Sequence, residues 1–193
     1  ALPDAFTAPF AFNPLMVAAC FSCACDALVS FNCAANASCC AAKACSADLL
    51  ATKEDCHYLS TRLRKEDYQE IKAMTGLPAL QSLLMGLKVR DVPMVICNDE
   101  NEPVAMLGVA PQGLLGLIWM VGTEDLKRIS LSFLRNSKEV CDVMKKDYKI
   151  LYNYVDARNT LHITWLKWMG FTFINKHQQF GIEGKLFYEF VKI

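Results

Sequence analysis

The alternation of apolar and polar residues is clearest in the last quarter of the chain. Residues 151–156 (LYNYVD) place successive side chains on two faces and are rich in strand-favouring residues, so they predict a strand. After a short loop, Asn159 is suited to cap a helix, because its side-chain oxygen can accept a backbone N–H of the first turn. Leu161, Trp165 and Trp168 then recur at helical spacing, which predicts one apolar stripe.

The same segment ends in a glycine and continues as further strands. Gly170 fits the position after a helix at which φ is positive, and Phe171 begins a new extended run. Residues 172–176 and 185–191 read as a final pair of strands, joined through a glycine-containing turn. The C-terminal part is therefore expected to be a strand, a capped helix and two more strands.

Residues 47–146 are expected to form a short strand, three helices, a three-stranded antiparallel meander and a long helix. The boundaries depend on helical apolar spacing, on Gly76 and Pro78 as stop and start signals, and on turn residues between strands. The first strand is expected at 47–52. The first helix is expected to run from 53 to a turn at 62–65, the second over 66–74 and the third over 79–87. The meander is expected at 93–97, 103–109 and 114–121, and the long helix at 124–146.

The first quarter of the chain has a different composition. Residues 1–47 hold fifteen alanines, three charged residues and seven of the ten cysteines. We expect an arm that packs against its own domain or a partner, with a non-native leader as the alternative, and one domain over residues 48–193. Prolines interrupt the uncharged run and a basic leading region is missing, so neither a clear membrane span nor a signal peptide is predicted.

Charge and cysteine spacing exclude some classes of partner and cofactor. The chain has 20 basic and 20 acidic residues, which argues against a nucleic-acid footprint. Cys20, Cys23 and Cys25 lie close together, but no second pair of ligands follows at zinc-finger spacing, so no metal is expected. The charged residues of positions 62–70 are interpreted as solvated surface, and His57 and His177 have no evident partner.

Asn159 followed by Gly170 and Phe171 resembles motif B of the GNAT superfamily of N-acetyltransferases, in which a strand leads into N-x-x-x-x-x-x-Y-x-x-x-G-F. The order of elements, β-αα(α)-βββ-α-β-α-ββ, agrees with that superfamily over residues 47–193. The resemblance implies an α/β (α+β) fold with a central, mixed, mostly antiparallel sheet flanked by helices.

The resemblance also implies a cofactor site. In that superfamily the strands corresponding to residues 114–121 and 150–156 splay apart, and the backbone of the first pairs with the pantetheine arm of acetyl-CoA. The cofactor's pyrophosphate lies at the N-terminus of the long helix, where free N–H groups favour an anion. The cofactor contacts that this implies are Trp119, Met120, Val121, Lys127, Arg128 and Asn159.

Two features depart from the superfamily pattern. The phosphate loop lacks its glycines, and Glu124 and Asp125 place carboxylates at the positive end of the expected helix. These carboxylates would repel a pyrophosphate unless the first helical turn begins later and brings Lys127 and Arg128 forward. The motif B tyrosine, which protonates the leaving thiolate in many members, is replaced by Leu166. We interpret His162 as a residue of the helix face, so no catalytic residue is assigned.

A second resemblance runs from about residue 118 to the C-terminus. Its best part is the run N-Y-V…N-T-x-H-I-x-x-L-K, which occupies residues 153–155 and 159–167. This pattern is similar to the internal virion protein A family of short-tailed bacteriophages, a GNAT-like group. It implies a phage protein made in the cytoplasm of the bacterial host and linked to virion assembly, with the virion as an alternative location.

Two functions from different classes follow from these resemblances. The first is a phage GNAT-like protein that acts in assembly by binding phage structural proteins or a host protein, with little or no catalysis. The alternative is an active N-acyltransferase that uses acetyl-CoA to modify an amine on a phage or host protein; proximity alone can supply much of the rate. The missing glycines, the acidic helix start and Leu166 favour the first.

Overall fold

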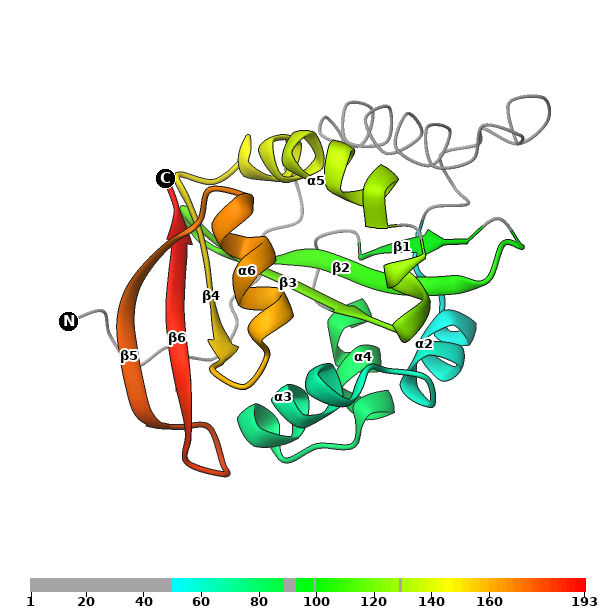
Figure 1. Ribbon diagram of the computed structural model, residues 1–193, viewed down its shortest axis with the longest axis horizontal. Helices are drawn as coiled ribbons and strands as arrows, with labels where there is room; N and C mark the ends of the chain where they lie inside the picture. The colour runs from blue at the N-terminus through cyan, green and yellow to red at the C-terminus, as the bar shows by residue number, and fades with distance from the viewer. Residues whose placement is uncertain (1–49, 89–92, 99, 129) are drawn as a thin grey trace.

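The computed structural model describes residues 50–88, 93–98, 100–128 and 130–193 (Figure 1). The expected arm at residues 1–47, with its cysteine cluster, lies outside these ranges, and its separation from a domain at 48–193 stays a prediction. No helix in the described ranges is long and apolar enough to cross a membrane. The same ranges contain no group of three or more side chains that could hold a metal ion.

Six strands form one sheet in the order β1-β2-β3-β4-β6-β5. Neighbouring strands are antiparallel except β3 and β4, which are parallel. The mixed, mostly antiparallel sheet is therefore confirmed. The strands are β1 (Met94–Cys97), β2 (Pro103–Gln112), β3 (Leu115–Gly122), β4 (Ile150–Asp156), β5 (Thr172–Phe180) and β6 (Lys185–Lys192).

The helices begin and end at local signals in the sequence. Thr52 caps the first of them through a capping box with Asp55, and Gly76 ends the second at a φ of 69°. The described helices are α2 (Lys53–Ser60), α3 (Lys65–Thr75), α4 (Ala79–Lys88), α5 (Ser130–Lys145) and α6 (Thr160–Trp168), with the 3-10 turn η2 (Glu124–Lys127) before α5.

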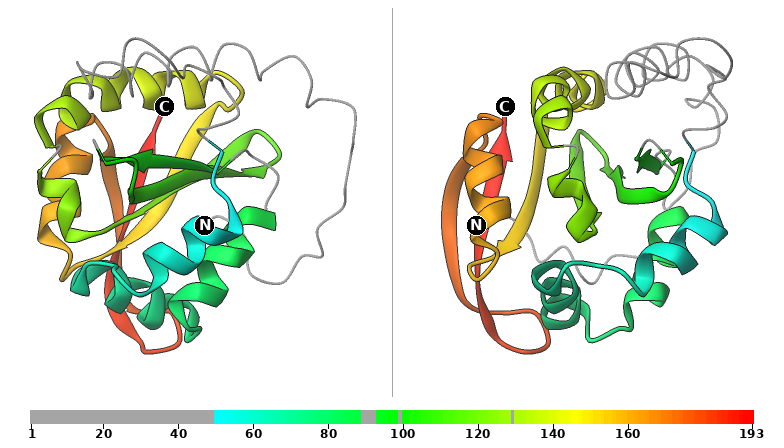
Figure 2. Two further views of the ribbon diagram at one scale, coloured as in Figure 1. Left: turned by 90° about the vertical axis from the view of Figure 1, so that its right-hand side faces the viewer. Right: turned by 45° about the vertical axis from the view of Figure 1, so that its right-hand side comes forward.

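Helices cover both faces of the sheet (Figure 2). Alternate residues of β2 point to opposite sides: Ala105 and Leu107 lie in the cluster that includes Val140 of α5, whereas Met106 packs with α2 and α4. Because β2 is buried on both faces, its sequence is a continuous apolar run instead of an alternating one. A third cluster joins α5 and α6 to β2, β4 and β6.

Three predicted elements differ from the structure. Residues 47–52 were expected as a strand, but the described part of that range makes only an isolated bridge between Leu50 and Met94. The long helix was expected from residue 124, but Glu124–Lys127 is a 3-10 turn and α5 begins at Ser130. Strand β2 continues through Pro111 to Gln112, so the turn to β3 falls at Gly113, where φ is 67°.

The predicted apolar stripe of α6 is wrong at two of its three residues, because only Trp165 packs against the core clusters. Leu161 and Trp168 are 51% and 44% exposed, whereas Leu166 and Met169 are buried. The rotation of the helix about its axis is set by Asn159, whose fully buried side chain fixes the first turn. With Asn159 pointing inward, the side chain seven residues later faces the sheet and Leu161 faces outward.

The turn between β5 and β6 packs against the end of α3. The Glu183 backbone N–H donates to the carbonyl oxygen of Ala73 at 3.1 Å. At Gly181, where φ is 68°, an added Cβ would lie 2.3 Å from that same oxygen, so only glycine fits. This contact places the β5–β6 turn beside α3 and near the loop that follows β4.

Candidate functional site

Strands β3 and β4 pair only at their beginnings and then separate. The register joins Leu115 to Ile150, Gly116 to Leu151 and Leu117 to Tyr152, and no later pair follows. One side chain crosses the widening gap: the Asn153 amide donates to the Ile118 carbonyl oxygen at 2.7 Å. The backbone from Trp119 to Gly122 therefore has no strand partner on the β4 side. This opening has the position that the superfamily resemblance implies for the pantetheine arm.

The carboxylate of Asp67 closes the far end of the gap. It accepts from Arg64 at 3.1 Å (Nε) and 2.6 Å (Nη2), from the Gly122 backbone N–H at 2.9 Å, and from the Asn159 amide at 3.0 Å. The Arg64 backbone N–H in turn donates to the Gly122 carbonyl oxygen at 2.9 Å. Helix α3 is thereby joined to the end of β3 and to the start of α6.

These groups are buried, which makes their pairing obligatory. Arg64 is 4% exposed, Asp67 3% and Asn159 0%. An unpaired charge at that depth would cost several kcal/mol, so each side chain depends on the others. The interpretation of residues 62–70 as solvated surface is therefore wrong for Arg64 and Asp67. The physical reason is that their partners lie on β3 and α6, far away in the sequence.

Glu70, one turn further along α3, extends the same network. Its carboxylate accepts from the Asn159 amide at 3.1 Å and from the Asp156 backbone N–H at 3.2 Å. Burial, followed by the nearby charge of Asp67, raises the pKa of Glu70 to about 8. Asp156 is itself buried and is paired with Arg158, whose guanidinium Nε lies 2.9 Å and 3.0 Å from its two oxygens.

Asn159 also performs the predicted capping role. Its side-chain oxygen accepts a hydrogen bond from the His162 backbone N–H at 3.4 Å, while its amide nitrogen donates to the carboxylates of Asp67 and Glu70. Both ends of the Asn159 side chain are thus engaged within the protein. Burial lowers the pKa of His162 to about 4, so its imidazole is neutral near pH 7.

Lys127 and Arg128, the residues expected to bind phosphate, lie in and just after η2 and pair locally. Lys127 forms an ion pair with Glu124, and Arg128 lies 3.3 Å from Asp125. Side-chain exposure of both cations is high, at 62% and 84%, so these pairs are weak. The structure therefore brings two carboxylates and two cations together in and just after this turn.

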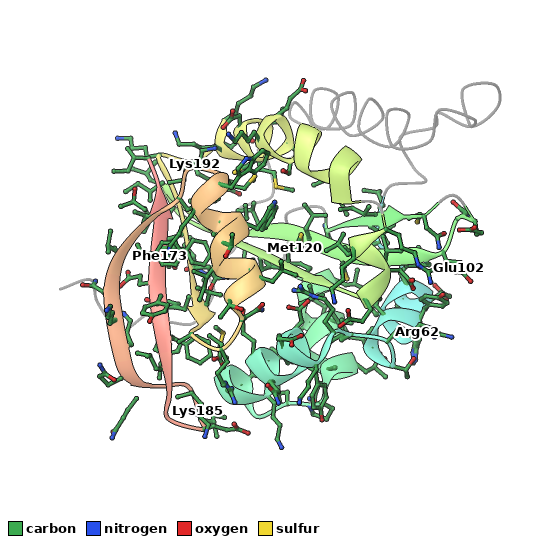
Figure 3. The ribbon with its side chains drawn as sticks, viewed as in Figure 1. Arg62, Glu102, Met120, Phe173, Lys185 and Lys192 are labelled. Carbon is green, nitrogen blue, oxygen red and sulfur yellow. The ribbon has the colours of Figure 1, made fainter. Side chains whose placement is uncertain are left out.

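Trp119, Met120 and Val121 occupy successive positions of β3 beside the gap. The Trp119 ring packs on Gly86 and Gly108. A side chain at either glycine would crowd the ring, because an added Cβ would lie 3.2 Å from it at Gly86 and 3.1 Å at Gly108. Met120 points to the opposite face, near the middle of the sheet (Figure 3). Together with Asn159, these residues line the two sides of the splay, whereas Lys127 and Arg128 lie in the turn beyond β3. A cofactor role for any of the six stays a prediction.

Possible proton donors near the gap have structural partners. Leu166, at the motif tyrosine position, is 3% exposed and lies in the core. Burial is the main cause that raises the pKa of Tyr152 and of Tyr154. The Tyr154 ring stacks on Phe180 with centroids 4.4 Å apart. A raised pKa makes a phenol a poorer acid, so neither tyrosine is activated for proton donation.

One polar pair had no signal in the sequence. His177 Nε2 lies 3.0 Å from an oxygen of Glu189, which also accepts from the Asn175 amide at 2.8 Å. Glu189 is 3% exposed and lies on β6, twelve residues from His177. The expectation that His177 has no partner is therefore wrong; cross-strand pairing supplies one.

The opening offers acetyl-CoA both favourable and unfavourable groups. Because α5 begins at Ser130, the positive end of the long helix lies after Lys127 and Arg128, but Glu124 and Asp125 lie in the preceding turn and the backbone N–H of Gly122 already donates to Asp67. The end of β3 is further covered by the bridge between Leu63 and Thr123. A ligand group that displaced the buried carboxylate of Asp67 from Gly122 would leave Arg64 unpaired.

Removing the Asp67 carboxylate tests how much the network contributes to stability. Asp67→Ala leaves a buried arginine and two amide donors without their acceptor, and we expect a loss of about 3 to 5 kcal/mol in the free energy of unfolding. Asp125→Ala removes an exposed carboxylate from an ion pair and should cost less than about 1 kcal/mol. Urea denaturation of both variants measures the difference; equal losses would contradict the arrangement.

Glu70 makes stability depend on pH in a defined direction. Its folded-state pKa of about 8 lies above the ordinary value of 4.5. The folded chain therefore binds more protons than the unfolded chain between these values. The stabilisation is complete below the lower value and is lost as pH rises through the upper one.

We therefore expect Glu70→Gln, which keeps an acceptor oxygen without the charge, to be close to wild type at about pH 5. At about pH 9 it should be more stable by on the order of 1 to 3 kcal/mol. Urea denaturation at the two pH values measures this difference, and a difference that does not change with pH would contradict it.

The arrangement of elements is shared with solved acetyltransferases. A ribosomal-protein-alanine N-acetyltransferase from Brucella melitensis superposes with a TM-score of 0.57 at 15% identity, over 75% of this chain and 97% of that one. The ribosomal-protein-S18-alanine N-acetyltransferase from Escherichia coli gives 0.54 at 13% identity, over 74% and 89%. A GNAT-family acetyltransferase from Bacillus anthracis gives 0.55 at 11% identity, over 75% and 92%. At these identities the likeness establishes the fold alone.

Sequence comparison adds a second relationship. Residues 95–178 match the family described as "Bacteriophage T7, probable scaffold protein Gp13". Comparison with curated proteins gave no match. The matched residues run from β1 to β5 and contain the whole β3–β4 opening and Asn159, but not α3 with Asp67. The chain therefore has the GNAT fold, and its central part is similar to a phage protein family.

Proposed function

We propose that this chain is a phage GNAT-fold protein that acts in virion assembly by binding other proteins, and that it does not transfer acyl groups. Its partners would be phage structural proteins or a host protein. It would act in the cytoplasm of the bacterial host or in the assembled virion. In this proposal the chain keeps the GNAT fold, and its own side chains occupy the opening that holds the cofactor in the superfamily's enzymes.

The observation that carries this proposal is the use of the β3–β4 opening by the protein's own side chains. Asp67 accepts hydrogen bonds from Gly122 and Asn159, which lie on the two sides of the gap. A working transferase needs backbone groups that are free to bind the thioester and developing charge. Here the last backbone N–H of β3 is already satisfied, and replacing its partner by a ligand would leave Arg64 buried and unpaired.

Two further features support the same conclusion. Lys127 and Arg128 pair weakly with carboxylates of their own turn, so a pyrophosphate bound to them would lie near the negative charges of Glu124 and Asp125. Leu166, at the position of the motif B tyrosine, cannot donate a proton. The match to a family described as a probable phage scaffold protein supports an assembly role.

Active N-acyl transfer from acetyl-CoA is the second candidate. It is favoured by the parting of β3 and β4 after Leu117 and Tyr152 and by the acetyltransferases that share the fold. In such an enzyme Trp119, Met120 and Val121 would present backbone groups to the cofactor. Lys127 and Arg128 would exchange their local carboxylates for its phosphates. The acceptor would be an amine on a phage or host protein.

Complementation of a phage that lacks this gene separates the two functions. We expect the double variant Lys127→Glu/Arg128→Glu to restore infectious particles as well as the wild-type chain does, because these exposed cations serve no cofactor. Asp67→Ala serves as the control for loss of fold, and circular dichroism checks each variant. Failure of the folded double variant, together with loss of acetylation of a phage or host protein, would contradict the assembly proposal.

A further inference from the structure

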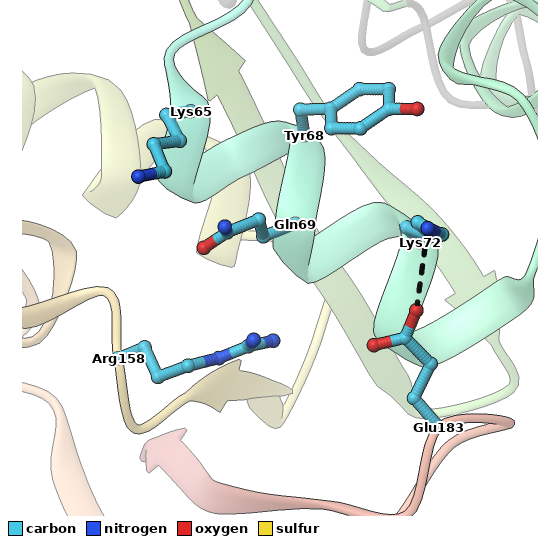
Figure 4. A pocket seen from close by; sticks show the side chains of 6 residues that line it. All are labelled: Lys65, Tyr68, Gln69, Lys72, Arg158 and Glu183. Carbon is cyan, nitrogen blue, oxygen red and sulfur yellow. Dashed lines mark ion pairs between the residues drawn. The ribbon is translucent and has the colours of Figure 1, made fainter.

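We propose that a cationic groove beside α3 binds an acidic peptide segment of a partner protein. This inference depends on the proposed function in one respect, that the chain works by binding. The groove lies outside the β3–β4 opening and uses the opposite face of α3. It has a volume of about 380 Å³. Its lining residues are Lys65, Tyr68, Gln69, Lys72, Arg158 and Glu183 (Figure 4).

Helical spacing separates the groove from the buried network. Lys65, Tyr68, Gln69 and Lys72 recur at intervals of three and four residues and form one face of α3. Asp67, on a different face, points into the β3–β4 opening. Because the buried ion pair and the β5–β6 turn hold α3 in place, the groove is formed before any ligand arrives, which reduces the entropy lost on binding.

The groove carries an excess of positive charge. Lys72 lies 3.8 Å from Glu183, with side chains 59% and 32% exposed, so this ion pair is weak. Arg158 is held by Asp156 but its side chain remains 43% exposed, and its guanidinium points toward α3 (Figure 4). Lys65 forms no ion pair with another residue in the described part of the chain. Three cations thus face one exposed carboxylate.

Apolar groups beside these cations favour a peptide over a nucleic acid. Tyr68 is 47% exposed in the groove, and Ile182 is 73% exposed next to Glu183, where it packs on Gly76 at the end of α3. Exposed aromatic and apolar side chains next to cations are typical of protein–protein contact sites. A volume of about 380 Å³ holds a few side chains, and the chain's net charge of zero gives no overall attraction for a polyanion.

We expect the ligand to be a short segment in which Asp or Glu alternates with bulky apolar residues. Its carboxylates would contact Lys65 and Arg158, and an apolar side chain would pack on Tyr68. Lys72 would exchange its weak partner Glu183 for a carboxylate of the ligand. Charge-assisted hydrogen bonds of this kind are shorter and stronger than neutral ones, and they lose strength as salt is added.

Fluorescence anisotropy of the full chain tests the site with a labelled synthetic peptide that alternates Glu with Leu and Phe. We expect binding that weakens with added salt, and no binding of the matched peptide with Gln in place of Glu. Lys65→Glu/Lys72→Glu should weaken binding by about tenfold or more, the equivalent of 1.4 kcal/mol. Lys53→Glu/Lys149→Glu makes the same change in net charge at exposed positions away from the groove and should change affinity by less than about twofold.

Any of three results would contradict the proposal that the groove binds an acidic peptide. These are no binding of the Glu peptide, equal weakening by the two double variants, or equal affinity for a single-stranded oligonucleotide of the same charge. The proposed function fails by a different readout, acetyl-CoA turnover by the wild-type chain. If the chain binds the peptide and also acetylates, the peptide site stands and the non-catalytic assembly role is rejected. If the chain neither acetylates nor binds the peptide, only the peptide site is rejected.

Discussion

The hydrogen bonds of the Asp67 carboxylate hold the open side of this sheet together. Strands β3 and β4 diverge after three paired positions, which leaves backbone groups of β3 without a strand partner. In a buried position such groups must be satisfied. Asp67 reaches Gly122 on one side of the gap and Asn159 on the other, while Arg64 neutralises its charge. Asp67 therefore satisfies the backbone N–H of Gly122, the buried last residue of β3.

This arrangement explains why helix α3 serves two surfaces. Its inner face supplies Asp67 and Glu70 to the gap, and the neutralising arginine precedes the helix. Its outer face is left free to carry Lys65 and Lys72 beside the loop after β4. The same contacts that join α3 to the β3–β4 opening therefore give the groove a fixed wall. The proposed binding role uses this combination.

The sequence was informative where structure is set by neighbours along the chain. The order of elements after residue 52, the cap at Asn159 and the stop at Gly170, with a φ of 86°, needed only local spacing and turn chemistry. The buried network was invisible because Asp67 meets Gly122 and Asn159 across separations of 55 and 92 residues. The rotation of α6 was misjudged for the same reason, since the buried Asn159 side chain determines which residues face the sheet.

Isothermal titration calorimetry of the full chain with acetyl-CoA tests most directly whether the protein's own carboxylates have replaced the cofactor. If Asp67 closes the opening, the titration gives no binding heat at millimolar acetyl-CoA. Micromolar binding that Lys127→Glu or Arg128→Glu weakens would contradict this, because it would place the cofactor's phosphates at η2 and its thioester between β3 and β4.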